Sequence, residues 1–252
     1  MRDGNLLRIL LLSLLLLCSG CSTMYDWLRA NPAPSTTFLE GTPKQEMQTP
    51  DFPFRMMWID KSVDLSKYRK IIIPPVTTKF LMDYNMWEKM NVESVAGDTN
   101  KAALEISGYM RFCFENAVIY DQTRRFKLVD DPGPDTLKLE LALVQLIPSK
   151  AELNIAETVV GIFIWPVALL TAFNSGFTAF EGILRDSQTG KVICTIADRE
   201  MDEMAILNRP GFQYYGNARY FIERWSQQFI DLMNSKDFTK LKTDFPAKLI
   251  VW

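Results

Sequence analysis

The fold is decided by residues 136–143, which are Thr136-Leu137-Lys138-Leu139-Glu140-Leu141-Ala142-Leu143. Leucine stands at every second position, and Thr, Lys and Glu fill the first positions between. Successive side chains of a β-strand point to opposite faces, so this alternation predicts a strand with one buried and one wetter face. The strand should end at Pro148, because proline cannot donate a hydrogen bond to a neighbouring strand.

A β-hairpin is predicted further along the chain. Residues 177–185 and 191–199 flank the short sequence Asp186-Ser187-Gln188-Thr189-Gly190. The glycine suits the positive φ angle that short hairpin loops require. We therefore expect two antiparallel strands joined by this loop.

A strand–helix–strand unit is predicted upstream. Three isoleucines, Ile71–Ile73, stop at two prolines and predict a buried strand, and a short strand is expected at residues 126–129. Between them, Gly97-Asp98-Thr99-Asn100 has the side chains of a helix start, and apolar residues then recur at helical spacing to Tyr120. We assign that apolar stripe to the core rather than to a binding groove. If both strands share one sheet, the unit should be a right-handed parallel crossover.

Residues 213–234 predict a second long amphipathic helix, whose polar face carries Arg219, Glu223, Gln227 and Asp231. The predicted fold is a single α+β domain with a mixed or antiparallel sheet of about five strands. Two long amphipathic helices should pack on the sheet, and one apolar helix-like stretch should lie elsewhere in the domain.

The first 21 residues have the pattern of a secretory signal. Arg2 and Arg8 accompany an apolar run that is too short to span a bilayer, and small residues follow it. Cys21 directly after Ser19-Gly20 resembles the lipobox of bacterial lipoproteins, although Cys18 stands where that pattern prefers leucine. The resemblance implies cleavage after Gly20 and acylation of Cys21. Ordinary secretion with a free Cys21 is the alternative.

The predicted organisation has three parts: a signal peptide (1–20), a lipidated N-terminus with a flexible tether (21–57), and an α+β domain (58–252). The tether is predicted because five prolines stand among Ser, Thr and Gln without any apolar period. Ser22 is not the aspartate associated with inner-membrane retention in related lipoproteins. We therefore expect an outer-membrane protein that faces the periplasm.

Composition excludes several classes of function. The chain contains no histidine, which removes Ser-His-Asp and Cys-His catalysis and His-ligated zinc. With 28 Lys+Arg against 30 Asp+Glu and no basic run, nucleic acid is not an expected partner. No cofactor or metal site is predicted. We expect Cys113 and Cys194 to be separately buried thiols; a disulfide is the alternative, and a catalytic thiolate is the least favoured hypothesis.

Acidic residues offer one enzymatic hypothesis. Paired carboxylates perform glycan hydrolysis, and the candidates are Asp130, Asp131, Asp135, Asp198, Glu200, Asp202 and Glu203. Aspartates beside Pro-Gly-Pro are more often ordinary turn residues. We therefore favour a turn at residues 130–135 and solvated side chains for the others.

Residues 158–173 carry no charge and include Pro166. Three hypotheses compete for this apolar stretch: a buried helical crossing, a surface that contacts a membrane or a partner, and a true membrane span, which its length disfavours. The candidate membrane or partner contacts are Val160, Ile164, Trp165, Leu169 and Phe173.

The chain resembles the DUF3313 family of bacterial lipoproteins, whose function is unknown. The resemblance lies in residues 67–76, 129–139, Pro148-Ser149, the apolar stretch and residues 182–199. These are strands and turns rather than a catalytic signature. The resemblance therefore implies a single-domain lipoprotein and supplies no active-site residue.

The function expected from the sequence is that of a non-enzymatic, lipid-anchored binding or scaffolding module at the periplasmic face of the outer membrane. Its partner would be an envelope protein, a cell-wall component or lipid. The alternative is an accessory lipoprotein of a transport or secretion assembly, with residues 158–173 used for insertion or oligomerisation. A carboxylate-based glycan hydrolase is the third hypothesis.

Overall fold

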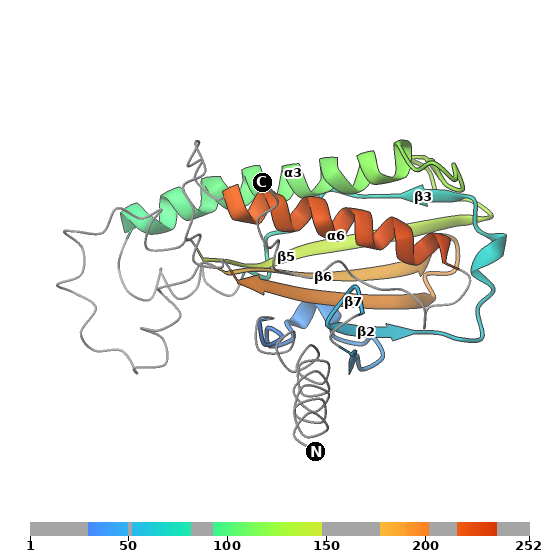
Figure 1. The fold of residues 1–252 in the computed structure, drawn as a ribbon, viewed down its shortest axis with the longest axis horizontal. Helices are drawn as coiled ribbons and strands as arrows, with labels where there is room; N and C mark the ends of the chain where they lie inside the picture. The colour runs from blue at the N-terminus through green and yellow to red at the C-terminus, as the bar shows by residue number, and fades with distance from the viewer. Residues whose placement is uncertain (1–29, 50–51, 82–92, 148–176, 202–215, 236–252) are drawn as a thin grey trace, which may run out of the picture.

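A computed structural model describes residues 30–49, 52–81, 93–147, 177–201 and 216–235 (Figure 1). Within these ranges the chain forms one α+β domain, in which two long helices cover one face of a seven-stranded mixed sheet. The strand order is β1-β2-β7-β6-β5-β3-β4. The elements are β1 (Glu46–Met47), β2 (Met56–Ile59), β3 (Lys70–Ile72), α3 (Glu93–Ile119), β4 (Lys127–Leu128), β5 (Thr136–Ile147), β6 (Phe177–Asp186), β7 (Val192–Met201) and α6 (Gly216–Asn234), with two short 3-10 helices, η1 (Thr37–Leu39) and η2 (Leu65–Lys67).

The central antiparallel strands are those expected from the alternating sequence. β5 pairs with β6 along its whole length, from Leu137 opposite Asp186 to Ile147 opposite Phe177. β6 and β7 form the predicted hairpin, and Gly190 has the expected positive φ of 71°. Asp186 Oδ1 accepts hydrogen bonds from the backbone N–H groups of Gln188 and Thr189 at 3.1 and 2.9 Å. The carboxylate thereby fixes the loop.

The predicted parallel unit is also present. β3 pairs in parallel with β4, and α3 connects them. The expected helix start is wrong, because α3 begins at Glu93 and residues 97–100 lie inside it. A glycine inside a helix costs only about 1 kcal/mol, so a helix continues through one when its neighbours favour it.

Two strands come from a segment that the sequence assigned to a flexible tether. β1 and β2 pair with each other, and β2 pairs with β7. Phe54 is fully buried, and Met57 and Leu39 are also buried. The expectations of about five strands and of a tether through residue 57 are therefore wrong for the described residues. The strands were missed because they are short and lie among prolines, so neither develops a visible alternation.

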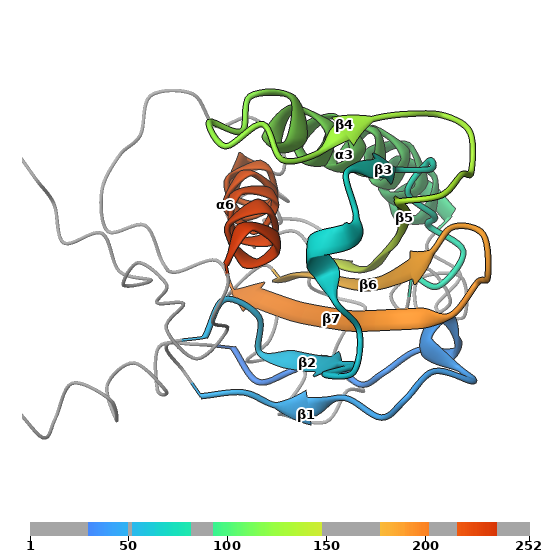
Figure 2. The same cartoon turned by 90° about the vertical axis from the view of Figure 1, so that its right-hand side faces the viewer.

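The sheet is covered on both faces at its centre. Ala142, Val144 and Ala179, which lie on the face away from the helices, pack against Ala33, Phe38 and Phe80. Consequently β5 is buried on both faces beyond Glu140, whereas its alternation predicted one wetter face throughout. The N-terminal segment supplies part of this cover. Figure 2 shows this arrangement, with β1 and β2 at one edge of the sheet and β3 and β4 at the other.

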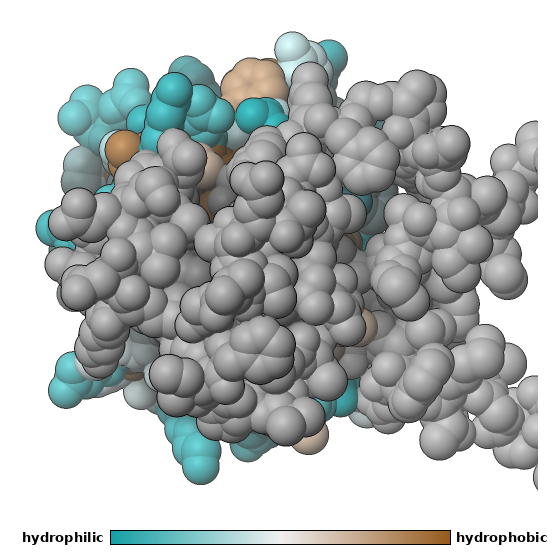
Figure 3. All heavy atoms as spheres, turned by 90° about the vertical axis from the view of Figure 1, so that its left-hand side faces the viewer, coloured by the Kyte–Doolittle hydropathy of each residue, from teal (hydrophilic) through white to brown (hydrophobic). Residues whose placement is uncertain are grey.

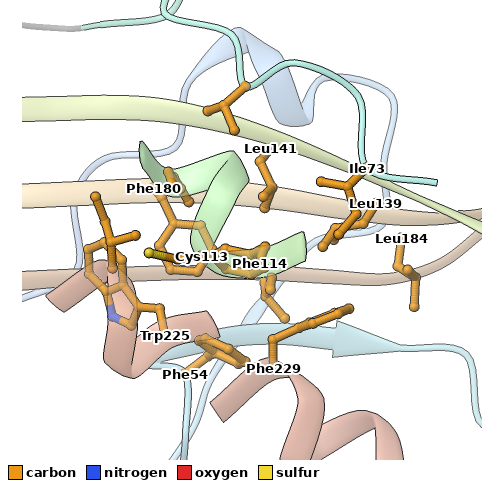
Figure 4. Packing of buried hydrophobic residues seen from close by; sticks show 14 of the residues in the cluster. Phe54, Ile73, Cys113, Phe114, Leu139, Leu141, Phe180, Leu184, Trp225 and Phe229 are labelled. Carbon is orange, nitrogen blue, oxygen red and sulfur yellow. The ribbon is translucent and has the colours of Figure 1, made fainter. Parts of the chain in front are cut away.

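The core is centred on Phe180 of β6 (Figure 4). Its ring lies 4.6 Å from Trp225 of α6, 5.8 Å from Phe54 and 6.2 Å from Phe114 of α3, measured between ring centroids. Two residues further along β6, a Cβ on Gly182 would lie 2.9 Å from Ile196 Cγ1. The glycine therefore leaves room for the core side chains of Ile196 and Leu141.

Residues 158–173 lie outside the described part of the chain, and so does the apolar helix-like stretch expected there. Among the helices that the structure describes, none has the length and apolar character to cross a bilayer.

We predict that Phe180→Ala lowers the free energy of unfolding by about 3–5 kcal/mol, because it leaves a cavity where three aromatic side chains from other segments meet. Urea unfolding followed by tryptophan fluorescence measures this loss. Phe112→Ala is the matched control: Phe112 is 57% exposed, so its truncation should change stability by about 0.5 kcal/mol or less. Equal losses in the two variants would contradict the central role of Phe180.

Candidate functional site

The N-terminal segment meets the sheet at the place where β5 ends and β6 begins. Ile147 and Phe177 pair with each other and are the residues on either side of 148–176. Ala30 packs against both of them, together with Met201 at the end of β7. The predicted contact residues, Val160, Ile164, Trp165, Leu169 and Phe173, belong to this intervening segment and lie outside the described residues.

This end of the sheet holds the N-terminal segment through further contacts. The Arg199 guanidinium lies over the Phe177 ring, 4.0 Å from its centroid, and Nη1 donates to the carbonyl of Asn31 at 3.4 Å. Figure 3 views the molecule from this side, and the described side chains visible around the rim are mainly hydrophilic. The point at which residue 30 joins the folded body is thus fixed beside both ends of the segment 148–176.

A buried carboxylate secures the same N-terminal segment a few residues later. Glu181 of β6 accepts hydrogen bonds from Thr36, from the backbone N–H at 2.8 Å and from Oγ1 at 2.6 Å. Burial raises the pKa of Glu181 above its ordinary range, and the two hydrogen bonds oppose that shift. Thr36 Oγ1 also accepts from Phe38 N–H and so caps η1.

An open groove of about 900 Å³ lies between α3 and α6, which run in the same direction. The volume is within the range of small-molecule sites. Its lining comes from the second half of α3, the turn that follows, and α6: Tyr109, Phe112, Cys113, Asn116, Ala117, Tyr120, Asp121, Gln122, Thr123, Glu223, Ser226, Gln227, Asp231, Asn234 and Ser235. α3 returns between two parallel strands, so its second half lies toward the starts of β4 and β5, away from Ile147 (Figure 1).

Hydrogen bonds across the groove join the two helices. The Tyr109 hydroxyl donates to Glu223 Oε1. At the other end, Asn234 Nδ2 donates to Asp121 Oδ1 at 3.0 Å. These bonds place a carboxylate at each end of the groove.

The same contacts shift the pKa of two groups in the groove. Burial and the hydrogen bond to Glu223 raise the pKa of Tyr109. For Asp121, burial acts to raise the pKa, but the hydrogen bonds from Thr123 and Asn234 outweigh it and lower the pKa. Tyr109 therefore stays a neutral donor and Asp121 a charged acceptor at neutral pH.

The acidic residues proposed for hydrolysis are not gathered into one site. Asp135 forms an ion pair with Lys70 at 3.0 Å and belongs to the turn before β5. Asp198 and Glu200 are buried on β7, where Arg224 of α6 pairs with Glu200. Asp202 and Glu203 lie outside the described residues. Asp130 and Asp131 are exposed in the predicted turn between β4 and β5, whereas Asp198 and Glu200 lie on β7. In the described ranges no three His, Cys, Asp or Glu side chains converge as metal ligands.

The two cysteines within the described residues are unpaired and buried, so the alternative of a disulfide is wrong. Burial raises the pKa of the Cys194 thiol to about 12 and also raises that of Cys113. Both thiols are therefore protonated at neutral pH, and neither has the lowered pKa of a reactive cysteine.

The sequence did not predict the groove. Ile106, Met110 and Phe114 of the apolar stripe of α3 are buried as expected. The stripe also included Leu104 and Phe112, and for these two the core assignment is wrong, because they are 65% and 57% exposed. Phe112 forms one wall of the groove together with Tyr109 and Tyr120. The polar face of α6 was identified and forms the other wall. No sequence signal places these two faces side by side, because their juxtaposition depends on how the helices pack on the sheet.

Fold and groove together define a single-domain α+β protein with an open cleft in its helical layer. The chain belongs to the family described as "Protein of unknown function (DUF3313)", which matches residues 44–229. This confirms the resemblance found in the sequence. Because the family has no established function, membership assigns no activity.

Two solved structures of PelC dodecamers from Paraburkholderia phytofirmans are similar to this chain at low identity. The first is 6% identical, covers 71% of this chain and 98% of that chain, and has a TM-score of 0.37. The second is 8% identical, covers 68% of this chain and 93% of that chain, and has a TM-score of 0.34. No curated protein matches the chain.

Thr36→Val should destabilise the protein by about 1–3 kcal/mol at neutral pH, because it removes a hydrogen bond to a buried carboxylate without changing the side-chain volume. Urea unfolding measures the difference. Thr37→Val is the matched control, since Thr37 is exposed and does not contact Glu181. If the two variants are equally stable, Thr36 does not secure the segment.

The raised pKa of Glu181 predicts a pH dependence of stability. The carboxylate of Glu181 binds a proton more tightly in the folded protein than in the unfolded chain, where the pKa of a glutamate is 4.5. The stabilising contribution is thus fully present below pH 4.5 and is lost as pH rises through the raised pKa. Glu181→Gln should remove this part of the pH profile of the melting temperature. An unchanged profile would contradict the assignment.

Proposed function

We propose that this protein is a lipid-anchored binding module of the cell envelope, attached to the periplasmic face of the outer membrane through Cys21. The observation that carries the proposal is the packing of Ala30 against Ile147 and Phe177. The segment that leads from the anchor and the segment 148–176, which contains the apolar stretch 158–173, therefore join the folded body at one end of the sheet.

The distance to the anchor supports this orientation. Ala30 is the ninth residue after Cys21, and nine residues fully extended span about 30 Å. The contacts of residues 30–40 with the sheet replace the longer tether that the sequence suggested. A lipid on Cys21 would consequently hold the end of the sheet at Ile147 close to the membrane surface.

Residues 158–173 supply the second membrane contact in this proposal. The segment 148–176 that contains them starts and ends beside Ala30, so the proposal brings Val160, Ile164, Trp165, Leu169 and Phe173 to the same surface. Because the lipid on Cys21 would already anchor the chain, this second contact would fix the orientation of the domain.

The groove between α3 and α6 is the binding site in this proposal. It lies toward the starts of β4 and β5, so a molecule anchored at the Ile147 end would present the groove away from the membrane. Its lining combines aromatic rings with amide, hydroxyl and carboxylate groups, which is a composition suited to recognition. We propose binding rather than catalysis because Asp135 and Glu200 are held in ion pairs with Lys70 and Arg224, and the chain contains no histidine.

The orientation is tested with Val160→Asp, Ile164→Asp and Leu169→Asp combined, with and without Cys21→Ser. Vesicle flotation should show reduced association for Cys21→Ser and loss of the remainder when the three aspartates are added, because buried charge in a lipid surface is costly. Near-ultraviolet circular dichroism of the aromatic core checks that each variant is folded.

The matched control replaces three exposed apolar residues elsewhere, Met47, Leu104 and Ile119, by aspartate. It adds the same charge and should leave association unchanged. In the Cys21→Ser background, a folded triple variant that floats as well as its parent would exclude residues 158–173 as a membrane contact. Loss of oligomers without loss of flotation would instead favour the accessory role in an envelope assembly.

A further inference from the structure

The two walls of the groove differ in chemistry. The α3 wall presents aromatic rings, of which Phe112 is 57% and Tyr120 78% exposed. On the α6 wall, Glu223, Gln227 and Asp231 recur every four residues and therefore lie on one face of the helix. A ligand in the groove would have rings on one side and carboxylates on the other.

Three of the groove's own donors, Tyr109 Oη, Gln227 Nε2 and Asn234 Nδ2, are already bound to carboxylates of the groove. Glu223 and Asp231 are nevertheless exposed on α6, so a ligand in the groove can reach their carboxylates. Accessible carboxylates are acceptors only, which favours a ligand that donates hydrogen bonds.

The charge of the lining favours a cation. Asp121, Glu223 and Asp231 belong to it, and no described lining residue is Lys or Arg. A cation already occupies one position beside the aromatic wall, because the Arg219 guanidinium lies 4.5 Å from the centroid of the Tyr109 ring. Aromatic faces attract cations through the ring quadrupole, so the exposed rings are suited to the same contact.

The spacing of the carboxylates indicates an elongated ligand. Glu223 and Asp231 are eight residues apart on α6, which corresponds to about 12 Å along the helix axis. A single metal ion would need several ligands converging on one point, and these carboxylates are spread along the groove. Several charges distributed along one flexible chain match the arrangement better.

We propose that the groove binds a linear aliphatic polyamine such as spermidine. Its ammonium groups donate to the carboxylates of Glu223 and Asp231, and its methylene segments lie along Phe112 and Tyr120. Each ammonium has three N–H donors and no acceptor, which complements a groove rich in acceptors. This inference depends on the proposed binding role of the groove and is independent of the lipid anchor.

The test is calorimetric titration of spermidine into the full chain at low ionic strength. Binding should weaken as salt is added, because the carboxylates are exposed and screened. Glu223→Gln combined with Asp231→Asn should weaken it by about five- to tenfold, as expected for two exposed ion pairs. Tyr120→Ala should weaken it by about threefold.

The control for charge is Glu40→Gln combined with Glu105→Gln, which changes the net charge equally at exposed positions outside the groove. It should bind spermidine as the parent does, and fully N-acetylated spermidine should not bind. Absence of spermidine binding, equal weakening in both double variants, or equal binding of the acetylated compound would overturn the polyamine proposal. Flotation of the same protein tests the anchor separately, so the two failures are distinguishable.

Discussion

The contact of Phe180 with Trp225, Phe114 and Phe54 is the interaction on which the rest of the structure depends. The four rings come from β6, α6, α3 and the segment before β2, so one cluster joins both helices to the sheet and to the N-terminal part of the chain. Aromatic side chains bury large areas and prefer tilted pairs, which makes such a cluster both strong and specific in geometry. Gly182, two residues along β6, leaves the space that the side chains of Ile196 and Leu141 fill beside this cluster.

The neighbouring residue uses the opposite face of the same strand. Phe180 points toward the helices, whereas Glu181 points to the other face and accepts hydrogen bonds from Thr36. Two consecutive residues of β6 therefore hold the layers on both sides of the sheet. Burial of a carboxylate is unfavourable without partners, so Glu181 selects one position for the segment that satisfies it. This selectivity explains how a proline-rich segment with little apolar periodicity becomes part of the folded body.

The sequence predicted the elements whose signals are local. The leucines of β5, the hairpin at Gly190, the isoleucines of β3 and the periodicity of α6 each depend on residues close in the chain, and each prediction was confirmed. The elements that were missed depend on distant partners. β2 forms by pairing with β7. The position of Thr36 depends on its hydrogen bond to Glu181, which lies 145 residues further along the chain. The same limitation applies to the groove, whose walls are separate helices.

The groove stays open because bringing its two walls together would give little gain in free energy. The apolar faces of α3 and α6 are buried against the sheet, where Phe114 and Trp225 belong to the core. The hydrophobic effect therefore acts between the helices and the sheet and not on the outer surface of the helices. Above that level one wall carries carboxylates, which would lose hydration without gaining a partner if the rings of the other wall covered them. The hydrogen bonds at Glu223 and Asp121 fix the two ends of the groove, and the exposed rings of Phe112 and Tyr120 remain between them. The groove therefore follows from the packing of the two helices on the sheet and from the solvation of the α6 carboxylates, which together keep these rings apart from the opposite wall.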